Sequence, residues 1–459
     1  MPLASHRLRK ARPMLKAYRI LSTLLHPAII AWLRWRTAKG KEDPKRRSER
    51  FGQANIPRPD GQLVWIHAAS VGEAHSVLPL IEALCERYPQ ANILLTTGTV
   101  SSSTLMQSRL PERAFHQFVP VDTPLAVKRF LSYWQPDLAI WVESEFWPNL
   151  LRMTRQRNCP IVLVNARMSD RSYKRWQRHR GFITQLLNCF HTIYAGSRDD
   201  KSKFRRLGAE QAEYIGNIKY DAPKLPADPK TTSAILGKIG DRRVWLAAST
   251  HEGEEEKIAE VHRALKETYS DLLTIIVPRH AHRGEEVVQA LSGQKFTVSC
   301  RSKQQVILPE TDIYVADTMG ELGIFYRLTG IVFIGGSLVP HGGHNPLEPA
   351  QLDCAIVCGP HMENFQGMLA DLREENAITQ VHTLEELQDK VLHLLRDQDM
   401  QESLAKNALN LVKTRKGVIA NILNGAIANI PGFSPPIIVE PSDTDAEEEA
   451  AADEAIAGS

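Results

Sequence analysis

Short runs of Val, Ile and Leu recur along the chain, each followed by Gly, Ser or Asn and then by a stretch with helical spacing. Such runs are typical of buried strands in parallel sheets, which helices cover on both faces. They occupy residues 63–68, 93–97, 138–142, 161–165 and 192–195 in the first half, and 244–248, 272–277, 313–316, 331–334 and 355–358 in the second. The pattern predicts two α/β domains, each built on a parallel sheet.

The two halves are separated by residues 219–243, which carry three Pro and several charges and read as a hinge or linker. The chain has 459 residues, 43% hydrophobic and 24% charged, which is ordinary for a globular protein and excludes a mostly disordered or polytopic membrane chain. We therefore expect a basic N-terminal segment, a first Rossmann-like domain, a hinge, a second Rossmann-like domain and a disordered acidic tail. Their predicted bounds are 1–50, 51–220, 221–243, 244–430 and 431–459.

The net charge of +3 hides a strong asymmetry. Residues 1–50 hold 14 Lys or Arg against 3 Asp or Glu, whereas residues 440–459 hold 8 Asp or Glu and no base. The body between them is neutral, so a uniformly basic nucleic-acid binder is not expected. The six cysteines form no CxxC pair, and we expect them to be reduced and mostly buried.

The basic segment contains fourteen residues, 20–33, without a charged side chain. As a helix they would span about 21 Å, short of the roughly 30 Å of a bilayer core, and Pro27 interrupts them. Apolar side chains recur at helical spacing from Leu21 to Trp35, with bases on both flanks, a pattern typical of a helix lying on an anionic membrane surface. The alternative is a helix that packs on its own domain.

Two carboxylate positions stand where predicted strands end in the first half. Glu73 follows the first strand closely, where a carboxylate can serve as a general base, although Ser70-x-x-Glu73 also fits a helix capping box. Strand alternation would point Glu143 and Glu145 to one face, and the alternative is a helix start with solvated charges. Lys219 could reach an anionic leaving group, or simply be solvated. The first strand has no GxGxxG after it, which argues against a classical NAD site.

Three turns in the second half are candidate phosphate sites. The first holds Ser249 and Thr250 at a strand-to-helix junction, where Ser249-x-x-Glu252 again mimics a capping box. The second holds Arg279, a bidentate partner for phosphate or carboxylate. The third runs over residues 335–349, where paired glycines including Gly336 allow close backbone approach and Glu348 is placed to accept from ribose hydroxyls. Its two histidines, at 341 and 344, lack a third metal ligand nearby, so we expect no metal.

These stretches, taken together and in this order, resemble the 3-deoxy-D-manno-octulosonic acid (Kdo) transferases of lipopolysaccharide biosynthesis, glycosyltransferase family 30. The resemblance runs from about residue 39 to 413. The motifs that carry it are RFG (50–52), SVGE (70–73), PNL (148–150), NAR (165–167), GNIKYD (216–221), STHEGEE (249–255), PRH (278–280), DTMGELGIF (317–325), GGSLVPHGGHNPLEP (335–349), GPH (359–361) and NF (364–365). The chain departs from the family pattern at residues 96–101, at Ser144 and Phe146, and in its acidic tail.

The resemblance implies a GT-B fold, with two Rossmann-like domains facing across a cleft and an N-terminal membrane-associated helix. It implies transfer of Kdo from CMP-Kdo to the lipid A precursor (lipid IVA) with inversion, on the cytoplasmic side of the inner membrane, with no cofactor, metal or nucleic acid. Glu73 would be the catalytic base, while Glu143 and Lys219 would stabilise the transition state. CMP would be held by Ser249, Thr250, Pro278, Arg279, Met319, Gly320, Glu321, Gly336, Asn345, Pro346, Leu347 and Glu348.

Two other interpretations remain open on the residues alone. A nucleotide-sugar epimerase, or a transferase with another donor, would share the fold, and thermal stabilisation by UDP or UMP in place of CMP would identify it. A non-catalytic lipid-binding scaffold would tolerate substitution of Glu73 and Arg279 without a phenotype.

Overall fold

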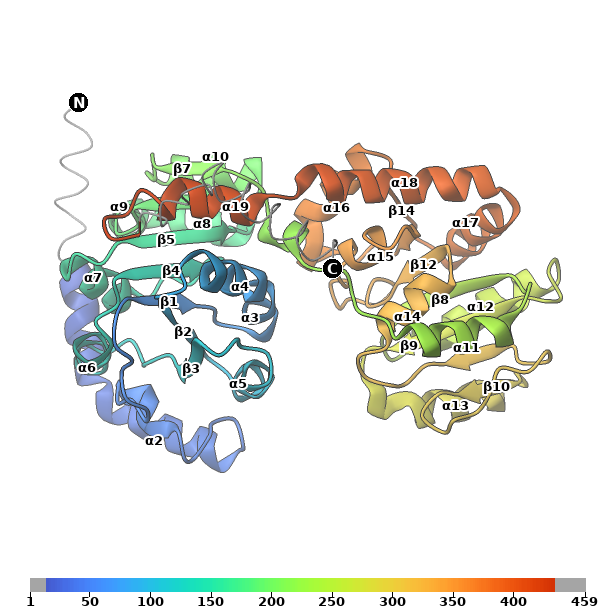
Figure 1. Ribbon diagram of the computed structural model, residues 1–459, viewed down its shortest axis with the longest axis horizontal. Coiled ribbons are helices and arrows are strands. Elements are labelled where there is room, and N and C mark those ends of the chain that lie inside the picture. Colours follow the sequence, from blue (N-terminus) through green and yellow to red (C-terminus); the bar gives the residue numbers. More distant parts are fainter. Residues whose placement is uncertain (1–13, 434–459) are drawn as a thin grey trace, which may run out of the picture. The chain divides into compact units, whose positions relative to one another are not determined.

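The computed structural model of the chain describes residues 14–433, which form two compact units (Figure 1). Within that range the first unit comprises residues 14–216 and 419–433, and the second unit comprises residues 217–418. Each unit holds one sheet of seven parallel strands with helices packed against it. Both predicted parallel sheets are therefore confirmed.

In the first unit the strands lie in the order β3-β2-β1-β4-β5-β6-β7. Trp65 on the central strand β1 and Trp141 on β4 are fully buried, with ring centroids 4.7 Å apart in an edge-to-face arrangement. These aromatic side chains anchor the core beneath the ends of both strands. The strands are β1 (Leu63–His67), β2 (Asn92–Thr97), β3 (Ala114–Phe118), β4 (Leu138–Val142), β5 (Ile161–Ala166), β6 (Thr192–Ala195) and β7 (Ala212–Tyr214).

Helices cover this sheet, and most of them connect consecutive strands, as parallel pairing requires. They are α2 (His26–Ala38), η1 (Arg47–Phe51), α3 (Val71–Ser76), α4 (Leu78–Arg87), α5 (Val100–Gln107), α6 (Pro124–Trp134), α7 (Pro148–Gln156), α8 (Asp170–Arg178), α9 (Arg180–Leu187), α10 (Arg198–Arg206), α19 (Val418–Ile422) and the π-helical turn η5 (Leu423–Ile427).

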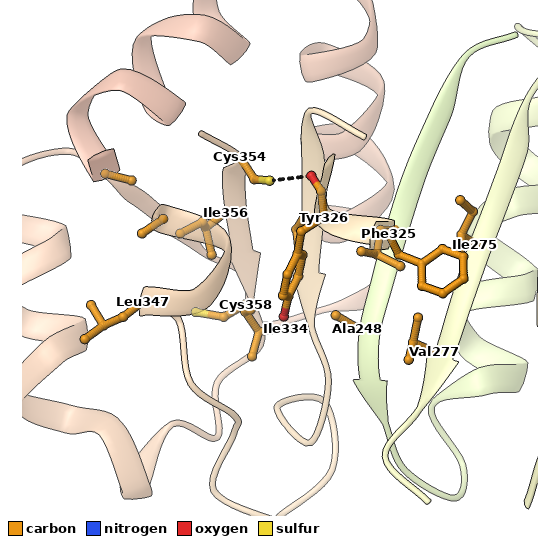
Figure 2. Packing of buried hydrophobic residues seen from close by; sticks show 14 of the residues in the cluster. Ala248, Ile275, Val277, Phe325, Tyr326, Ile334, Leu347, Cys354, Ile356 and Cys358 are labelled. Carbon is orange, nitrogen blue, oxygen red and sulfur yellow. Dashed lines mark hydrogen bonds between the residues drawn. The ribbon is translucent and has the colours of Figure 1, made fainter. Parts of the chain in front are cut away.

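In the second unit the strand order is β10-β11-β9-β8-β12-β13-β14. Figure 2 shows its core, where Phe325 and Tyr326 from α14 pack beside Ile275 and Ala248, and the Cys354 thiol donates to the Tyr326 carbonyl over 3.2 Å. The strands are β8 (Val244–Thr250), β9 (Leu273–Pro278), β10 (Val298–Cys300), β11 (Ile313–Val315), β12 (Ile331–Ile334), β13 (Ala355–Cys358) and β14 (Ile378–Gln380). The six cysteines are free, as predicted, and five are buried.

The helices of the second unit lie mainly between its strands or after β14. They are η2 (Ile218–Asp221), α11 (Pro229–Ile239), α12 (Glu255–Lys266), η3 (Ala281–Arg283), α13 (Gly284–Gly293), α14 (Leu322–Leu328), α15 (Leu347–Ala350), η4 (Glu363–Phe365), α16 (Gln366–Glu374), α17 (Leu384–Arg396) and α18 (Gln398–Arg415).

Two details differ from the predicted division of the chain. The expected hinge, residues 221–243, contains helix α11, whose N-cap Asp228 accepts from the backbone N–H of Thr231 over 2.8 Å. Residues 419–430, expected in the second domain, belong to the first unit, where Ile422 and Ile427 are buried. The chain therefore passes from the first unit to the second and returns. The predicted acidic tail lies outside the described residues from 434 onward.

The apolar N-terminal stretch is two helices and not one. Residues 14–24 are helical, Leu25 forms a turn, and α2 follows with Pro27 in its first turn. Leu15 and Leu33 are buried against the first unit, whereas Leu24 and Trp35 are 71% and 56% exposed. Within residues 14–433 no helix is both long enough and apolar enough to cross a bilayer.

Candidate active-site residues in each unit

Glu73 lies at the first turn of α3, directly after the end of β1. Its backbone N–H donates to the Ser70 hydroxyl over 3.2 Å, and its carboxylate accepts from that hydroxyl over 3.0 Å and from the Ala69 N–H over 2.8 Å. Ser70 thus caps α3 as predicted, while the reciprocal bond of a capping box runs to the Ala69 N–H in place of the Ser70 N–H. The same hydrogen bonds fix the carboxylate at the carboxyl end of the sheet, where parallel-sheet proteins bind ligands.

The pKa of the Glu73 carboxyl is raised to about 7, first by burial, then by the negative charge of Glu143, with a smaller effect of Glu145. The two hydrogen bonds from Ala69 and Ser70 act in the opposite direction but do not offset the burial. A carboxyl with a pKa close to neutral can exchange a proton with an alcohol more readily than an ordinary glutamate. Capping and catalysis are therefore compatible roles for this residue.

Glu143 and Glu145 do not follow the strand alternation that was expected of them. Strand β4 ends at Val142, and Glu143 has a left-handed backbone with φ of +58°, which turns the chain immediately after the strand. Strand alternation therefore does not extend to these two residues. Their charges still act on Glu73, so the turn holds both carboxyls near α3. Burial raises the pKa of Glu145, while a hydrogen bond from Trp147 opposes it.

Lys219 belongs to the second unit and not, as predicted, to the first domain. It lies in η2, where the Asn217 side chain caps the turn by accepting from the Lys219 backbone N–H over 3.0 Å. Its ammonium stands 5.7 Å from the centroid of the Phe365 ring. The residue is partly buried rather than freely solvated.

The turn between β8 and α12 is organised by a residue that the sequence analysis missed. Glu254 is completely buried and its carboxylate accepts from four backbone N–H groups, those of His251, Gly336, Ser337 and Leu338, at 2.6 to 3.0 Å. The Ser249-x-x-Glu252 capping box is not formed, because Ser249 lies in the strand with φ of +60° and α12 begins at Glu255. The sequence analysis did not identify Glu254 because three of its four partners, Gly336, Ser337 and Leu338, lie far along the chain.

Among the predicted nucleotide ligands of this turn, Thr250 is buried and donates to the Glu255 carboxylate over 2.9 Å. Its carbonyl accepts from the Arg279 N–H over 2.9 Å, which joins the ends of β8 and β9. Pro278 ends β9 and is buried, whereas Arg279 is exposed. Thr250 therefore positions the turn, and the guanidinium of Arg279 is the group open to a ligand.

Histidines gather beside Arg279, also outside the predicted set. The Nε2 atoms of His251 and His344 are 2.8 Å apart, and the rings of His251 and His341 are 3.7 Å apart between centroids. Burial and the neighbouring positive groups, Arg279 among them, lower the pKa of His251 to about 4 and that of His344 to about 3. A Cβ at Gly336 would lie 3.2 Å from ring atoms of both His251 and His344, which is tighter than an ordinary contact, and the φ of +66° also favours glycine. No cluster of residues suited to a metal ion occurs in the described part of the chain.

The remaining predicted ligands form two short segments. Asn345, Pro346, Leu347 and Glu348 lead into α15, where the Asn345 amide donates to the Glu348 carboxylate over 3.2 Å. Burial raises the pKa of Glu348, and the charge of Arg279 opposes this, which places the two groups near each other. Gly320 has φ of +82°, next to the exposed Met319, and Glu321 is paired with Arg301 at 2.8 Å.

The chain was compared with known proteins. The family model for 3-deoxy-D-manno-octulosonic-acid transferase (kdotransferase) matches residues 45–222. A probable mitochondrial 3-deoxy-D-manno-octulosonic acid transferase of Arabidopsis thaliana is 36% identical over 419 residues, 89% of this chain and 94% of that protein. The 3-deoxy-D-manno-octulosonic acid transferase of Haemophilus influenzae is 34% identical over 421 residues, 89% of this chain and 96% of that protein.

Solved structures with little sequence identity share the fold. A glycosyltransferase from Rickettsia africae aligns with a TM-score of 0.55 at 11% identity, over 80% of this chain and 98% of that one. This likeness agrees with the predicted pair of Rossmann-like sheets of GT-B type. Fold and sequence lead to the same assignment, and the identity to full-length relatives decides it: the chain belongs to the 3-deoxy-D-manno-octulosonic acid transferase family.

Proposed function

We propose that this Kdo transferase moves Kdo from CMP-Kdo to the acylated lipid A precursor, an early step of lipopolysaccharide core assembly, with Glu73 as the base. We assign the base on one observation: the Glu73 carboxyl lies just after the end of β1, and its pKa is raised to about 7. An ordinary surface glutamate would be too weak a base for an alcohol.

In the proposed reaction the Glu73 carboxylate accepts the proton of an acceptor hydroxyl as its oxygen attacks the anomeric carbon of Kdo. The bond from that carbon to the phosphate oxygen breaks, and CMP leaves with the electron pair. Attack opposite to the leaving group gives inversion. Glu143 lies near Glu73 and carries the charge that suits an anomeric carbon with cationic character.

Negative charge develops on the phosphate of the departing CMP. Arg279 is exposed at the end of β9, and Lys219 belongs to the same unit, so both are candidates to stabilise this charge. Gly336 and the segments Met319–Glu321 and Asn345–Glu348 complete the proposed CMP site. Glu348, close to Arg279, is suited to accept hydrogen bonds from ribose hydroxyls.

Product mass spectrometry tests the function directly. Purified protein incubated with CMP-Kdo and the tetra-acylated lipid A precursor should yield products heavier by one or more Kdo units, and CMP should raise the Tm of the protein more than UMP does. A Tm shift with UMP or UDP alone, and no mass gain, would favour an epimerase or another donor. A mass gain unaffected by substitution of both Glu73 and Arg279 would contradict the assigned residues.

We propose further that the N-terminal helices bind the cytoplasmic face of the inner membrane. Deleting them would also remove the buried Leu15 and Leu33, so two exposed side chains offer a cleaner test. The double substitution Leu24→Glu and Trp35→Glu should move most of the protein from vesicles containing anionic lipid to the supernatant, because two apolar side chains are lost and two negative charges repel the surface. Leu24→Ala with Trp35→Phe is the milder control. Unchanged pelleting of the Glu double variant would place the membrane contact elsewhere.

A further inference from the structure

A pocket of about 320 Å³ opens in the first unit between the N-terminal helices and the loop that follows β3. This is within the size range of small-ligand sites. Its lining includes residues 119–122 and Arg50, and its apolar wall is formed by side chains from three separate segments. Those side chains are Tyr18, Leu21, Leu25, Ile29, Trp32 and Trp147.

The polar groups that line this pocket already have protein partners. The Tyr18 hydroxyl donates to Asp122 over 2.9 Å, and Asp122 also accepts from the backbone of Asn149. Ser22 accepts from the Asn149 amide over 3.1 Å, and Arg50 donates to the Val119 carbonyl over 2.6 Å. What remains for an occupant is apolar surface, and Leu21, Leu25 and Trp32 are about half exposed at its edge. The pocket therefore suits a hydrocarbon chain rather than a sugar or a nucleotide.

The pocket shares one wall residue, Trp147, with the turn that holds carboxylates near Glu73. Trp147 lines the pocket and also hydrogen-bonds to Glu145, and Glu145 lies close enough to Glu73 for its charge to act there. One side chain thus forms a wall of the pocket and a support of the proposed catalytic turn. A ligand that fills the pocket would therefore contact a residue of this turn.

A cationic helix packs against the same turn. Phe146, the neighbour of Trp147, packs edge-to-face against Trp176 of α8, with ring centroids 6.5 Å apart. Helix α8 bears Arg171, Lys174, Arg175 and Arg178, which line a hollow of about 480 Å³. Residues 143–147 therefore join an apolar pocket to a strongly basic surface. This combination is complementary to a lipid that carries both hydrocarbon chains and phosphates.

We propose that the apolar pocket receives an acyl chain of the phosphorylated acceptor lipid, whose phosphates bind the basic side chains of α8. The inference rests on the proposed function, which it extends to the way in which the acceptor is recognised. It makes the N-terminal helices a part of the acceptor site in addition to a membrane contact.

Two exposed apolar residues of similar size allow a matched test in the full-length chain. Leu25 lines the pocket, whereas Ile20, in the preceding helix, does not, and both are exposed. Leu25→Trp fills the pocket and should raise KM for the acylated acceptor about tenfold or more, with KM for CMP-Kdo unchanged. Ile20→Trp adds the same apolar volume outside the pocket and should leave both constants within about twofold. Ile29→Trp, from α2, is the second pocket-filling variant should Leu25→Trp fail to fold.

A de-acylated, phosphorylated acceptor separates the alternatives. Both Trp variants should use it as wild type does, since it has no chain to place in the pocket. Equal KM values of Leu25→Trp and Ile20→Trp for the acylated acceptor, with wild-type turnover intact, would overturn the pocket assignment alone. Absence of transfer by wild type would instead overturn the proposed function.

Photolabelling gives a readout that does not depend on turnover. An acceptor with a diazirine at the end of one acyl chain should label residues 18–32 and 119–122 in wild type and lose this labelling in Leu25→Trp. Equal labelling by a diazirine phospholipid in the same vesicles would show ordinary membrane contact and contradict the inference. Labelling that appears only after residues 1–13 are removed would show that the chain itself occupies the pocket, which also contradicts it.

Discussion

Replacing Glu73 with Gln should lower transfer of Kdo by about 10²–10⁴-fold while leaving the fold and the binding of CMP intact. The amide oxygen can accept from the Ala69 N–H and the amide nitrogen can donate to the Ser70 hydroxyl, so both partners of the carboxylate keep a hydrogen bond. What is lost is the capacity to accept a proton. A variant with near-normal turnover would remove Glu73 from the role of base.

The pH dependence of the wild-type transfer rate should also report Glu73 as the base. The pKa of Glu73 is raised to about 7 by burial and by the charge of Glu143, so below that pH the carboxyl is protonated and inactive. We expect the rate of transfer to rise about tenfold per pH unit up to about 7 and then to level off. The residual rate of the Gln variant should lack this rise, and single-turnover measurement would keep product release from masking it.

Stability should respond in the opposite direction to activity. A carboxyl whose pKa is raised on folding stabilises the fold fully below its unfolded pKa, and this contribution is lost as the pH rises through the folded pKa. Ionising Glu73 therefore weakens the fold between about pH 4.5 and 7, the range in which catalysis increases. A group that is unfavourable for the fold at neutral pH is what the proposed role of Glu73 as base would require.

The sequence predicted the centres of both sheets well and their edges poorly. Ten predicted strands are present, and the four that were missed, β3, β7, β10 and β14, are the outermost strands of the two sheets. An edge strand pairs on one side only, so its sequence need not be continuously apolar. The strand Ala212–Tyr214, for example, has one buried, one exposed and one half-buried residue. Hydrophobic runs identify strands that helices cover on both faces and fail where that cover ends.

Positions within the site were predictable where the cause is local. The Ser70 cap of α3 follows from spacing alone, and it holds the proposed base. Glu143 was expected to follow strand alternation, but its left-handed backbone reverses the chain, and nothing in the adjacent residues signals this. The pairing of His251 with His344 joins residues 93 positions apart. Such contacts depend on the strand order, which the hydrophobic pattern does not specify.

Several of the proposed catalytic and nucleotide residues are positioned in the same way. Thr250, Pro278 and Arg279 lie at or directly after the carboxyl end of a parallel strand, and Thr250 is held there by its hydrogen bond to the buried Glu255. Arg279 and Met319 are the exposed residues of the proposed nucleotide site. Preorganisation of this kind lets a site present charge to a ligand without reorganising when it binds.

The largest stability effect should come from Glu254, which contacts no proposed substrate atom. Glu254→Ala leaves four backbone N–H groups without their acceptor in a site closed to water. Each unsatisfied donor costs about 1–3 kcal/mol, and partial relaxation reduces the sum, so we expect a loss of about 3–5 kcal/mol. Urea unfolding followed by far-UV circular dichroism measures it.

Glu252 is the matched control, because it is an exposed glutamate two residues away in the same turn. Glu252→Ala should change stability by no more than about 0.5 kcal/mol. The two substitutions remove the same charge, so a difference between them reports the hydrogen bonds and not the local electrostatics. Equal effects of both would show that the carboxylate of Glu254 is replaceable by water or by a shift of the loop.

Loss of Glu254 should also weaken the binding of CMP, because the Gly336–Leu338 backbone is part of the proposed nucleotide site. Hydrogen exchange can separate this local effect from global unfolding. The amides of Gly336, Ser337 and Leu338 should exchange about a hundredfold faster in Glu254→Ala, while those of β13, which pairs with β12 but not with Glu254, should change only as much as global stability does. If the three amides and β13 accelerate equally, Glu254 stabilises the second unit as a whole. If the loop accelerates more, the buried carboxylate has the specific role of shaping the backbone that meets the nucleotide.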